Sequence, residues 1–147
     1  MRIFVSQAFR SYASAKVVAD LVDAFKWWKE STGREFQSPI FGKDAALFSP
    51  KVGGRAYALR HCHLVPLNDA NALKAWARSH RFGSRKVSDR VLIYVQQDDD
   101  FLLIDIVDDP GAHALMRMTD KQGKSFMLKC AEEAEAFFDG RLKIHRA

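Results

Sequence analysis

The sequence predicts an α+β fold, a single domain over residues 1–147 in which helices pack on a mainly antiparallel sheet. The clearest observation is a pair of apolar segments, residues 91–96 and 101–107, whose short polar connection is typical of an antiparallel hairpin. Residues 14–30 and 125–139 have the three- and four-residue apolar spacing of helices. No repeat, low-complexity tract or linker divides the chain, and its length suits one core.

The first third of the chain predicts a strand, a helix and a loop. Residues 2–5 are rich in β-branched and aromatic side chains, which favours a short strand. In the helix over residues 14–30, Gly33 suits a left-handed cap just beyond the end. The apolar face of this helix consists of Val18, Leu21, Phe25 and Trp28. The density of proline and glycine between residues 36 and 55 indicates an ordered loop with at most one helical turn.

The middle of the chain predicts a strand over residues 57–65 and a helix over residues 69–80. Alternation along the strand puts His61 and His63 on one face. The opposite face carries Arg60, Cys62 and Leu64. The helix directs Leu73 and Trp76 inward, and a basic loop over residues 81–86 follows it.

The last third begins with the hairpin, whose second strand directs Leu102, Ile104 and Ile106 to the core and leaves Leu103 and Asp105 on the other face. Asp109 and Pro110 are typical of an N-cap and a first helical residue, which predicts a short helix to about residue 117. Gly123 interrupts the helical pattern, and Gly140 suits the cap of the last helix. The buried face of that helix consists of Met127, Cys130, Ala134 and Phe137.

Composition excludes several classes of protein. An apolar share of 48% with 12% aromatic residues excludes a disordered chain. No apolar run approaches the ~20 residues that a membrane span needs, and the N-terminal apolar patch is too short for a signal peptide. Cys62 and Cys130 lie in apolar stretches without C-x-x-C spacing, which favours buried thiols. We therefore expect a cytoplasmic protein without a membrane partner.

Basic charge is concentrated in one part of the chain. Residues 1–97 carry 16 Lys and Arg against 7 Asp and Glu, whereas residues 98–139 carry 4 against 11. The densest basic stretch, residues 74–90, has aromatic side chains between its cations, a combination that can neutralise phosphates and stack on bases. A solvated, charged helix and loop is the simpler interpretation of charge alone.

Familiar enzyme signatures are missing, because the sequence has neither a Gly-rich phosphate loop nor a G-x-S-x-G turn. The residues that remain suit phosphodiester cleavage. That reaction needs a base for the 2′-hydroxyl proton, an acid for the leaving oxygen and cations for the phosphate. It needs no metal and no cofactor, and we expect none.

His61 and His63 are the first catalytic candidates, because histidine titrates near neutrality and can give or take a proton. Judged by spacing alone, two histidines hydrogen-bonded on a partly buried strand are an equally good interpretation. The same spacing suits zinc, but no third and fourth ligands stand at the usual separations.

Three more residues are catalytic candidates, each with a structural alternative. Tyr94 can polarise a phosphate or stack on a base, or be a core aromatic with its hydroxyl at the rim. Asp44 can orient a histidine or an arginine, or cap a helical turn. Arg90 has the guanidinium fork that matches phosphate, or is an ordinary surface residue. The cations predicted to contact RNA are Lys43, Arg60, Arg78, Arg81, Arg85 and Lys86.

Several short blocks follow one another as they do in the YafO family of toxins, which the chain resembles over roughly residues 36–138. The most distinctive are Phe41-Gly42-Lys43-Asp44-Ala45 and His61-Cys62-His63-Leu64. The others are Ser88-Asp89 with Leu92-Ile93-Tyr94, then Leu102-Leu103-Ile104, and the ending over residues 124–137 with Ala134-Glu135-Ala136-Phe137. Residues 78–86 are more basic than this resemblance implies.

The resemblance implies a bacterial type II toxin that a cognate antitoxin holds inactive and that cleaves messenger RNA at the ribosome. It also implies a fold like that of RelE-type toxins, whose open sheet face meets RNA. We therefore expect a metal-independent endoribonuclease that inhibits translation and leaves a 2′,3′-cyclic phosphate. The alternatives are a non-catalytic basic protein that stalls ribosomes and, last, a DNA-binding regulator, for which no helix-turn-helix is evident.

Overall fold

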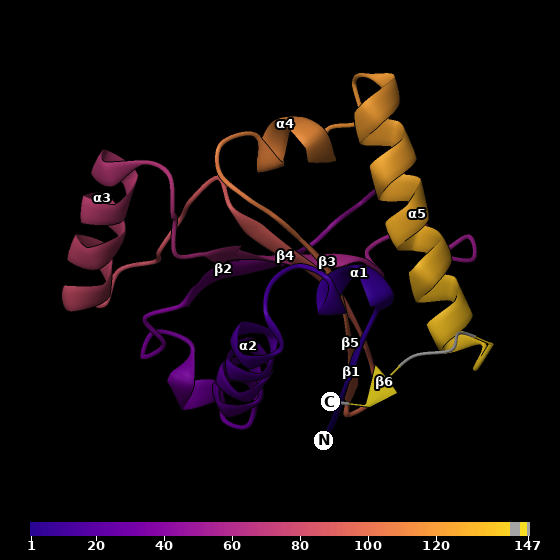
Figure 1. Ribbon diagram of the computed structural model, residues 1–147, viewed down its shortest axis with the longest axis horizontal. Coiled ribbons are helices and arrows are strands. Elements are labelled where there is room, and N and C mark those ends of the chain that lie inside the picture. Colours follow the sequence, from indigo (N-terminus) through magenta and orange to yellow (C-terminus); the bar gives the residue numbers. More distant parts are fainter. Residues whose placement is uncertain (142–144, 147) are drawn as a thin grey trace.

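The computed structural model describes residues 1–141 and 145–146 and is built on a six-stranded sheet of order β2-β3-β4-β5-β1-β6 (Figure 1). β1 pairs with β5 in parallel, and all other neighbours are antiparallel. This arrangement confirms the predicted α+β class with a mainly antiparallel sheet, while the likeness to RelE-type toxins stays a prediction. The strands are β1 (Arg2–Val5), β2 (Phe41–Ala46), β3 (Arg60–Leu64), β4 (Val91–Gln97), β5 (Asp100–Val107) and β6 (His145–Arg146).

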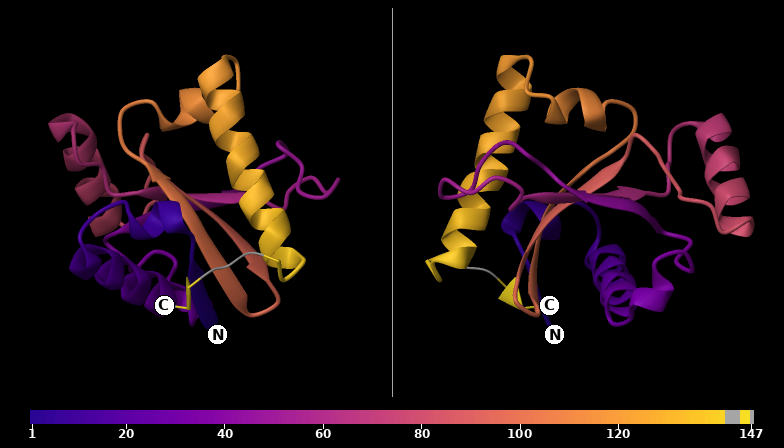
Figure 2. Two further views of the ribbon diagram at one scale, coloured as in Figure 1. Left: turned by 45° about the vertical axis from the view of Figure 1, so that its right-hand side comes forward. Right: turned by 180° about the vertical axis from the view of Figure 1, so that it is seen from behind.

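Helices cover both faces of the sheet and one of its edges. Figure 2 shows α2 on one side of the twisted strands and α5 on the other, while α3 stands at the end of the molecule beyond β2. The helices are α1 (Gln7–Arg10), α2 (Ala15–Lys29), the 3-10 turn η1 (Thr32–Arg34), α3 (Ala70–Arg81), α4 (Ala112–Met116) and α5 (Lys121–Phe138). Among the described residues, no helix is long and apolar enough to cross a membrane.

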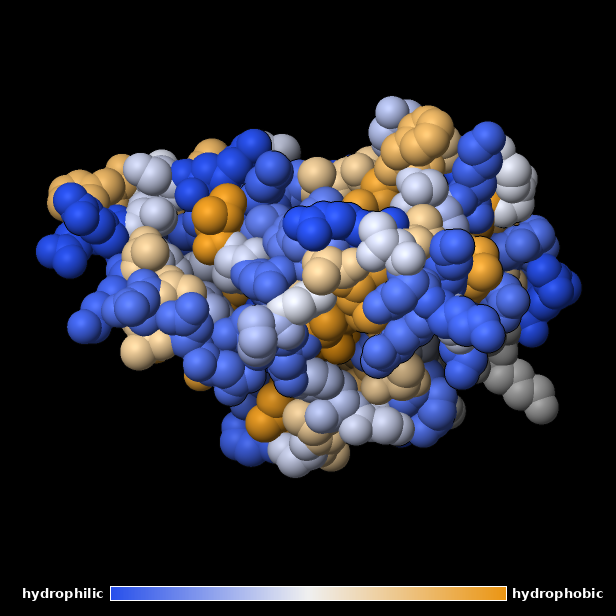
Figure 3. Space-filling view, turned by 90° about the horizontal axis from the view of Figure 1, so that it is seen from above, coloured by the Kyte–Doolittle hydropathy of each residue, from blue (hydrophilic) through white to orange (hydrophobic). Residues whose placement is uncertain are grey.

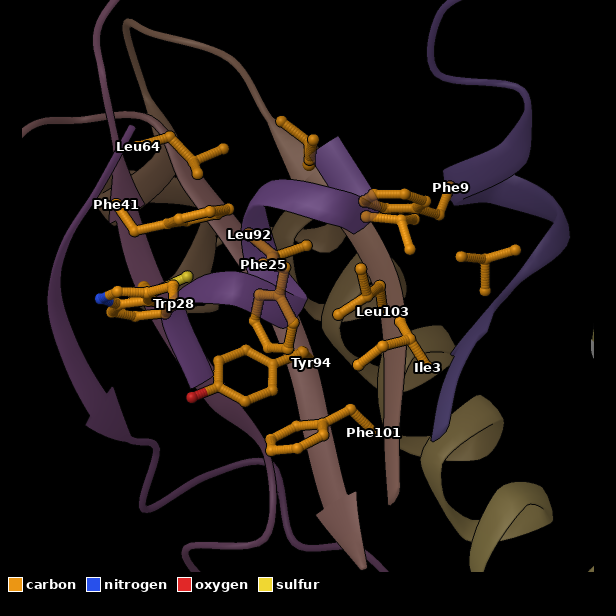
Figure 4. Close-up of a cluster of buried hydrophobic side chains, with 14 of the residues drawn as sticks. Ile3, Phe9, Phe25, Trp28, Phe41, Leu64, Leu92, Tyr94, Phe101 and Leu103 are labelled. Atoms are coloured by element: carbon orange, nitrogen blue, oxygen red, sulfur yellow. The ribbon is translucent and has the colours of Figure 1, made fainter. Parts of the chain in front are cut away.

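The first core lies between α2 and the sheet and is strongly aromatic (Figure 4). Phe25 is fully buried and makes edge contacts with Phe41 and Tyr94, whose ring centroids lie 5.8 and 5.2 Å away. Trp28 stacks on Phe41 at 4.8 Å. These contacts confirm the predicted apolar face of α2, because Val18, Phe25 and Trp28 all point into the core.

The second core lies on the opposite face, under α4 and α5. Met127, Cys130, Ala134 and Phe137 of α5 are buried there, as their helical spacing predicts. Cys130 and Cys62 are both buried, free thiols, in agreement with the sequence.

The segment predicted as a loop between residues 36 and 55 contains a strand, β2, so that interpretation is wrong. Gly42 has a packing role there. A Cβ atom at Gly42 would lie 2.3 Å from the carbonyl oxygen of Lys86 and 2.8 Å from the ring of Trp76. Gly42 thus lets the chain that leaves α3 lie directly against β2.

The ends of the helices differ from the prediction in several places. The C-cap of α2 is Glu30, and Gly33 lies within η1 without the left-handed geometry of a cap. The last helix starts earlier than predicted, with Asp120 as its N-cap. Gly123 lies inside this helix. A Cβ atom at this position would come 2.6 Å from the carbonyl oxygen of Leu115, so the close contact between α4 and α5 requires a glycine. Gly140 has φ +68° and ends the helix as predicted.

Asp109 does not cap α4, whose N-cap is Gly111. The Asp109 carboxylate accepts hydrogen bonds from the backbone nitrogens of Leu67 and Asn68, at 2.9 and 2.8 Å, and so fixes the turn before α3. In α3 only Trp76 is buried, whereas Leu73 is 44% exposed, against the prediction.

The hairpin is confirmed, but the two faces of β5 are both buried. Leu103 is fully buried in the first core, although alternation left it off the core face. A register shift between Ile93 and Tyr94 also turns Ile106 into the first core, away from Leu102 and Ile104 in the second.

Candidate active site

The alternation of β3 places two sets of polar residues on opposite faces of the sheet. Arg60 pairs with Tyr94 and Cys62 with Leu92, and these residues face the first core. His61 pairs with Ile93 and His63 with Val91, which face the second core. The prediction that His61 and His63 share a face is therefore confirmed. The sheet separates them from Asp44 and Tyr94, with which the sequence had grouped them as catalytic.

A third histidine completes a cluster on the second face. His113, near the start of α4, lies with its ring centroid 4.8 Å from that of His63 and 6.1 Å from that of His61. One nitrogen of each of the three rings lies within 4.8 Å of the others. His61 and His63 are 8% and 5% exposed, whereas the His113 side chain is 37% exposed. Solvent and ligands therefore reach the cluster at His113.

Asp89 fixes the ring of His113. Its Oδ1 atom lies 2.8 Å from His113 Nδ1 and accepts a hydrogen bond from the His113 backbone nitrogen at 2.9 Å. Its Oδ2 atom accepts from Gly111 at 2.5 Å. Burial alone would raise the pKa of Asp89, but these hydrogen bonds lower it, so the carboxylate stays ionised. An ionised acceptor favours the His113 tautomer that carries its proton on Nδ1, in which the Nε2 atom has the lone pair.

The ring of His63 is held in the opposite tautomer. Its Nδ1 atom accepts a hydrogen bond of 2.9 Å from the backbone nitrogen of Ser88, which places the ring proton on Nε2. Burial and the neighbouring rings of His113 and His61 lower the pKa of His63 to about 4. His63 is thus a neutral hydrogen-bond donor at neutral pH.

His61 carries an unsatisfied nitrogen. Its Nδ1 atom is buried and has no hydrogen-bond partner, and among the described residues it is the one buried side-chain nitrogen or oxygen in that state. Burial lowers the pKa of His61, and so does repulsion from His113 when that ring is protonated. The charge of Lys43 lowers the pKa of both His61 and His63, so this cation acts on the same cluster.

One connecting segment, residues 86–90, organises the cluster. The backbone oxygen of Lys86 accepts a hydrogen bond of 2.8 Å from the backbone nitrogen of Lys43. This bond lies next to the point where Gly42 lets the two segments come close together. Two residues later Ser88 bonds to His63, and Asp89 bonds to His113. The segment that leaves α3 therefore sets the position of Lys43 and the tautomers of two histidines.

Asp44 and Tyr94 form a closed polar group on the first face. The Tyr94 hydroxyl lies 2.7 and 2.8 Å from the two carboxylate oxygens of Asp44, and it points out of the aromatic core (Figure 4). Lys29 Nζ pairs with Asp44 at 2.6 Å, and Arg60 lies 3.4 Å from the same carboxylate. Asp44 is thus a strand residue at the centre of an ion network, and its predicted alternative role as a helix cap is wrong.

Two predicted site residues are buried in structural contacts. Arg90 is 5% exposed and donates to Asp108, to the Val65 carbonyl oxygen and to the Tyr12 hydroxyl. Lys86, predicted on the surface with the RNA-binding cations, is 1% exposed and donates to the Ser38 carbonyl oxygen. The Lys86 side chain is therefore not accessible to a ligand, which corrects the expectation that it contacts RNA.

The remaining predicted cations lie at the surface. Arg78, Arg81 and Arg85 on α3 and the loop after it are exposed, at an end of the molecule whose surface mixes hydrophilic and hydrophobic residues (Figure 3). Arg60 is partly exposed at the rim of a pocket of about 330 Å³ that Trp28 and Asp44 also line. The placement of His61 and His63 on one face of the strand and of Arg60 on the other was predicted from alternation and is confirmed.

The sequence interpretation missed His113 and Asp89. Neither stands at a usual ligand or catalytic spacing from His61 and His63, because α4 and the connection before β4 bring them there only in three dimensions. One signal was available, since Ser88-Asp89 was among the blocks of the resemblance, but nothing in the chain linked it to a histidine.

Comparison with known proteins identified a family for this chain. The sequence pattern of the toxin YafO family, of type II toxin–antitoxin systems, matches residues 26–139, which is well over half of the chain. No curated protein and no solved structure matched. The matched range includes Lys43, all three clustered histidines and Asp89. The chain therefore belongs to the YafO family of toxins of type II toxin–antitoxin systems.

Proposed function

We propose that this toxin is a ribosome-associated endoribonuclease of the cytoplasm that cleaves messenger RNA and inhibits translation without a metal or cofactor. Membership of a type II toxin family supports the toxin role and implies a cognate antitoxin as partner. The observation that carries the cleavage proposal is the Asp89–His113 pair, which presents a free ring nitrogen beside His61 and His63.

His113 is the base in this proposal. With Nδ1–H bonded to Asp89, its Nε2 lone pair takes the proton of a ribose 2′-hydroxyl. The 2′-oxygen attacks the adjacent phosphorus, the bond to the 5′-oxygen breaks, and a 2′,3′-cyclic phosphate remains. The leaving 5′-oxygen takes its proton from water, which reaches the site on the exposed side of His113.

Lys43 and His63 stabilise the phosphate as its charge grows. Lys43 supplies a positive charge close to the cluster. His63 is neutral and keeps its proton on Nε2, so it donates a hydrogen bond without first being protonated. Such preorganised donors are most effective where burial excludes water, as it does at His61 and His63.

The exposed arginines hold the RNA strand and the ribosome. Arg78, Arg81 and Arg85 lie on α3 and its following loop, and that loop leads directly into the segment that organises the cluster. The phosphates of an RNA strand bound along this loop then approach Lys43. Asp44, Tyr94 and Arg90 hold the fold in this proposal and take no part in the chemistry, because each is engaged by several protein partners.

A translation-coupled assay tests the proposal. A defined transcript is translated in a reconstituted system with the purified toxin, and the new RNA ends are mapped and tested for cyclic phosphate. The His61→Ala, His63→Ala double variant and the His113→Gln variant are expected to lose cleavage. His80→Asn serves as the matched control, because it keeps an acceptor for Lys86 outside the cluster.

Cutting that persists undiminished in both variants would remove these histidines from the mechanism. Far-ultraviolet circular dichroism checks that each variant is folded, and His113→Gln replaces a partly exposed side chain, so it is the safer of the two. The exposed arginines of α3 also fit the second candidate, a non-catalytic protein that stalls ribosomes. Intact transcripts beside arrested translation would decide for that candidate.

A further inference from the structure

We propose that the three histidines also form a binding site for a transition-metal dication of the zinc type, and that the bound metal inhibits cleavage. The inhibition rests on the proposed function, because the metal would occupy the lone pair that acts as base. The binding itself rests only on the geometry of His61, His63 and His113 and is measured separately.

The ring nitrogens form an almost closed ligand set. One nitrogen of each ring lies within 4.8 Å of the others. Tetrahedral zinc with nitrogen ligands at roughly 2.0–2.1 Å brings such nitrogens to about 3.3 Å from one another. His113 lies in a short helix and its side chain is 37% exposed, so it can make this small approach. A water molecule from the open side supplies the fourth ligand.

Two of the three histidines are prepared to bind. The buried Nδ1 of His61 has no hydrogen-bond partner in the part of the chain that the structure describes, and a metal would satisfy it. His113 directs Nδ1 to the Asp89 carboxylate, which leaves Nε2 for the metal. A carboxylate on the outer nitrogen of a metal-bound histidine fixes the tautomer and raises the basicity of the ligand.

His63 makes the binding reversible. Its Nδ1 accepts from Ser88, so its proton lies on Nε2. To bind a metal through Nε2, the ring must carry its proton on Nδ1, where it would face the Ser88 donor. The positive charge of Lys43 also opposes a dication. These two effects predict a regulatory occupant that chelators remove.

Metal titrations on the full-length, metal-free toxin test the binding. Zn²⁺ is followed by calorimetry, and Co²⁺ by the visible absorption that appears when it becomes tetrahedral. His113→Ala and His61→Ala are expected to weaken binding by at least about 100-fold, and Asp89→Asn by about 10–100-fold. His80→Asn, outside the cluster, is expected to bind like the parent protein. Equal affinity in the parent and both cluster variants would overturn the site.

A cleavage assay with added Zn²⁺ tests the inhibition. Cleavage is expected to fall in step with occupancy of the site and to return when a chelator is added. Stimulation by Zn²⁺, or cleavage that stays unchanged at saturation, would overturn the inhibition. If Zn²⁺ binds as expected but no condition yields cleavage, the proposed function fails while the metal site stands. If cleavage occurs and Zn²⁺ does not bind, the metal site fails while the proposed function stands.

Discussion

The two faces of β3 carry polar groups in opposite states. On the first face, Asp44 is engaged by Tyr94, Lys29 and Arg60, so every charge meets a partner. On the second face, the buried His61 Nδ1 atom has no partner among the described residues, and the bond between His113 Nδ1 and Asp89 leaves the other ring nitrogen of His113 free. One strand thus builds a closed network on one side and an open cluster on the other.

The difference teaches how to assign roles to buried polar residues. A buried group that is fully paired contributes to the fold, whereas one that is left unpaired costs free energy and needs another explanation. In this chain the unpaired group lies beside two more histidines and a positioned carboxylate. We therefore assign stability to the first face and chemistry to the second.

Among the residues that support the histidines, the largest expected effect is on the second face, in Asp89→Asn. An asparagine cannot hold the proton of His113 on Nδ1 as an ion does, so we expect the rate of transcript cleavage to fall about 100-fold or more. The melting temperature checks that the fold survives. A cleavage rate within about threefold of the parent would mean that Asp89 only holds the backbone at the start of α4.

The next effect is expected for Gly42→Ala, at the contact between β2 and the segment that leaves α3. The added Cβ would lie 2.3 Å from the Lys86 carbonyl oxygen, so the segment that organises the cluster must shift. We expect the free energy of unfolding to fall by about 1–3 kcal/mol, measured by urea denaturation. Gly33→Ala is the matched control for loss of a glycine, because its added Cβ would meet only the Ser31 hydroxyl, at 3.8 Å. Equal, small losses in both would show that Gly42 is not a packing requirement.

A smaller effect is expected on the first face, in Tyr94→Phe. The variant removes one hydroxyl from the Asp44 network and leaves Lys29 and Arg60 in place. We expect a loss of about 1 kcal/mol in stability with the ring contacts unchanged. Cleavage by the folded protein should stay within about twofold, whereas a much larger loss would move Tyr94 into the chemistry.

The smallest effect is expected for Arg78→Ala with Arg81→Ala, on the surface of α3. Both side chains are exposed, so their removal should leave stability unchanged. RNA binding should weaken and depend less on salt, with the logarithmic slope reduced by about 0.7 for each phosphate of a single strand that the arginines no longer neutralise. Filter binding at several salt concentrations measures the slope. An unchanged slope would place the RNA elsewhere.

Much of this fold could be predicted because its local patterns are strong. The apolar stripe of α2 and the hairpin of β4 and β5 follow directly from residue spacing. β2 was missed because Gly42 looks like a chain breaker in sequence, whereas it permits a close approach that exists only in the folded protein.

The candidate site could be predicted only in part, for a related reason. Residues two apart on one strand share a face, so His61 and His63 could be paired from sequence. Asp89 and His113 join them through contacts between distant segments, which spacing does not encode. Asp44 and Tyr94 were grouped with them by chemistry, but alternation along the strands places them on the opposite face.

The central claim is tested most directly by one paired measurement, the rates of translation-coupled transcript cleavage by His113→Gln and by Tyr94→Phe at a temperature where both are folded. We predict that His113→Gln loses about 100- to 10,000-fold in rate, as expected for loss of a base, while Tyr94→Phe stays close to the parent. Nearly full cleavage by His113→Gln together with a large loss in Tyr94→Phe would contradict the assignment and move the chemistry to the first face.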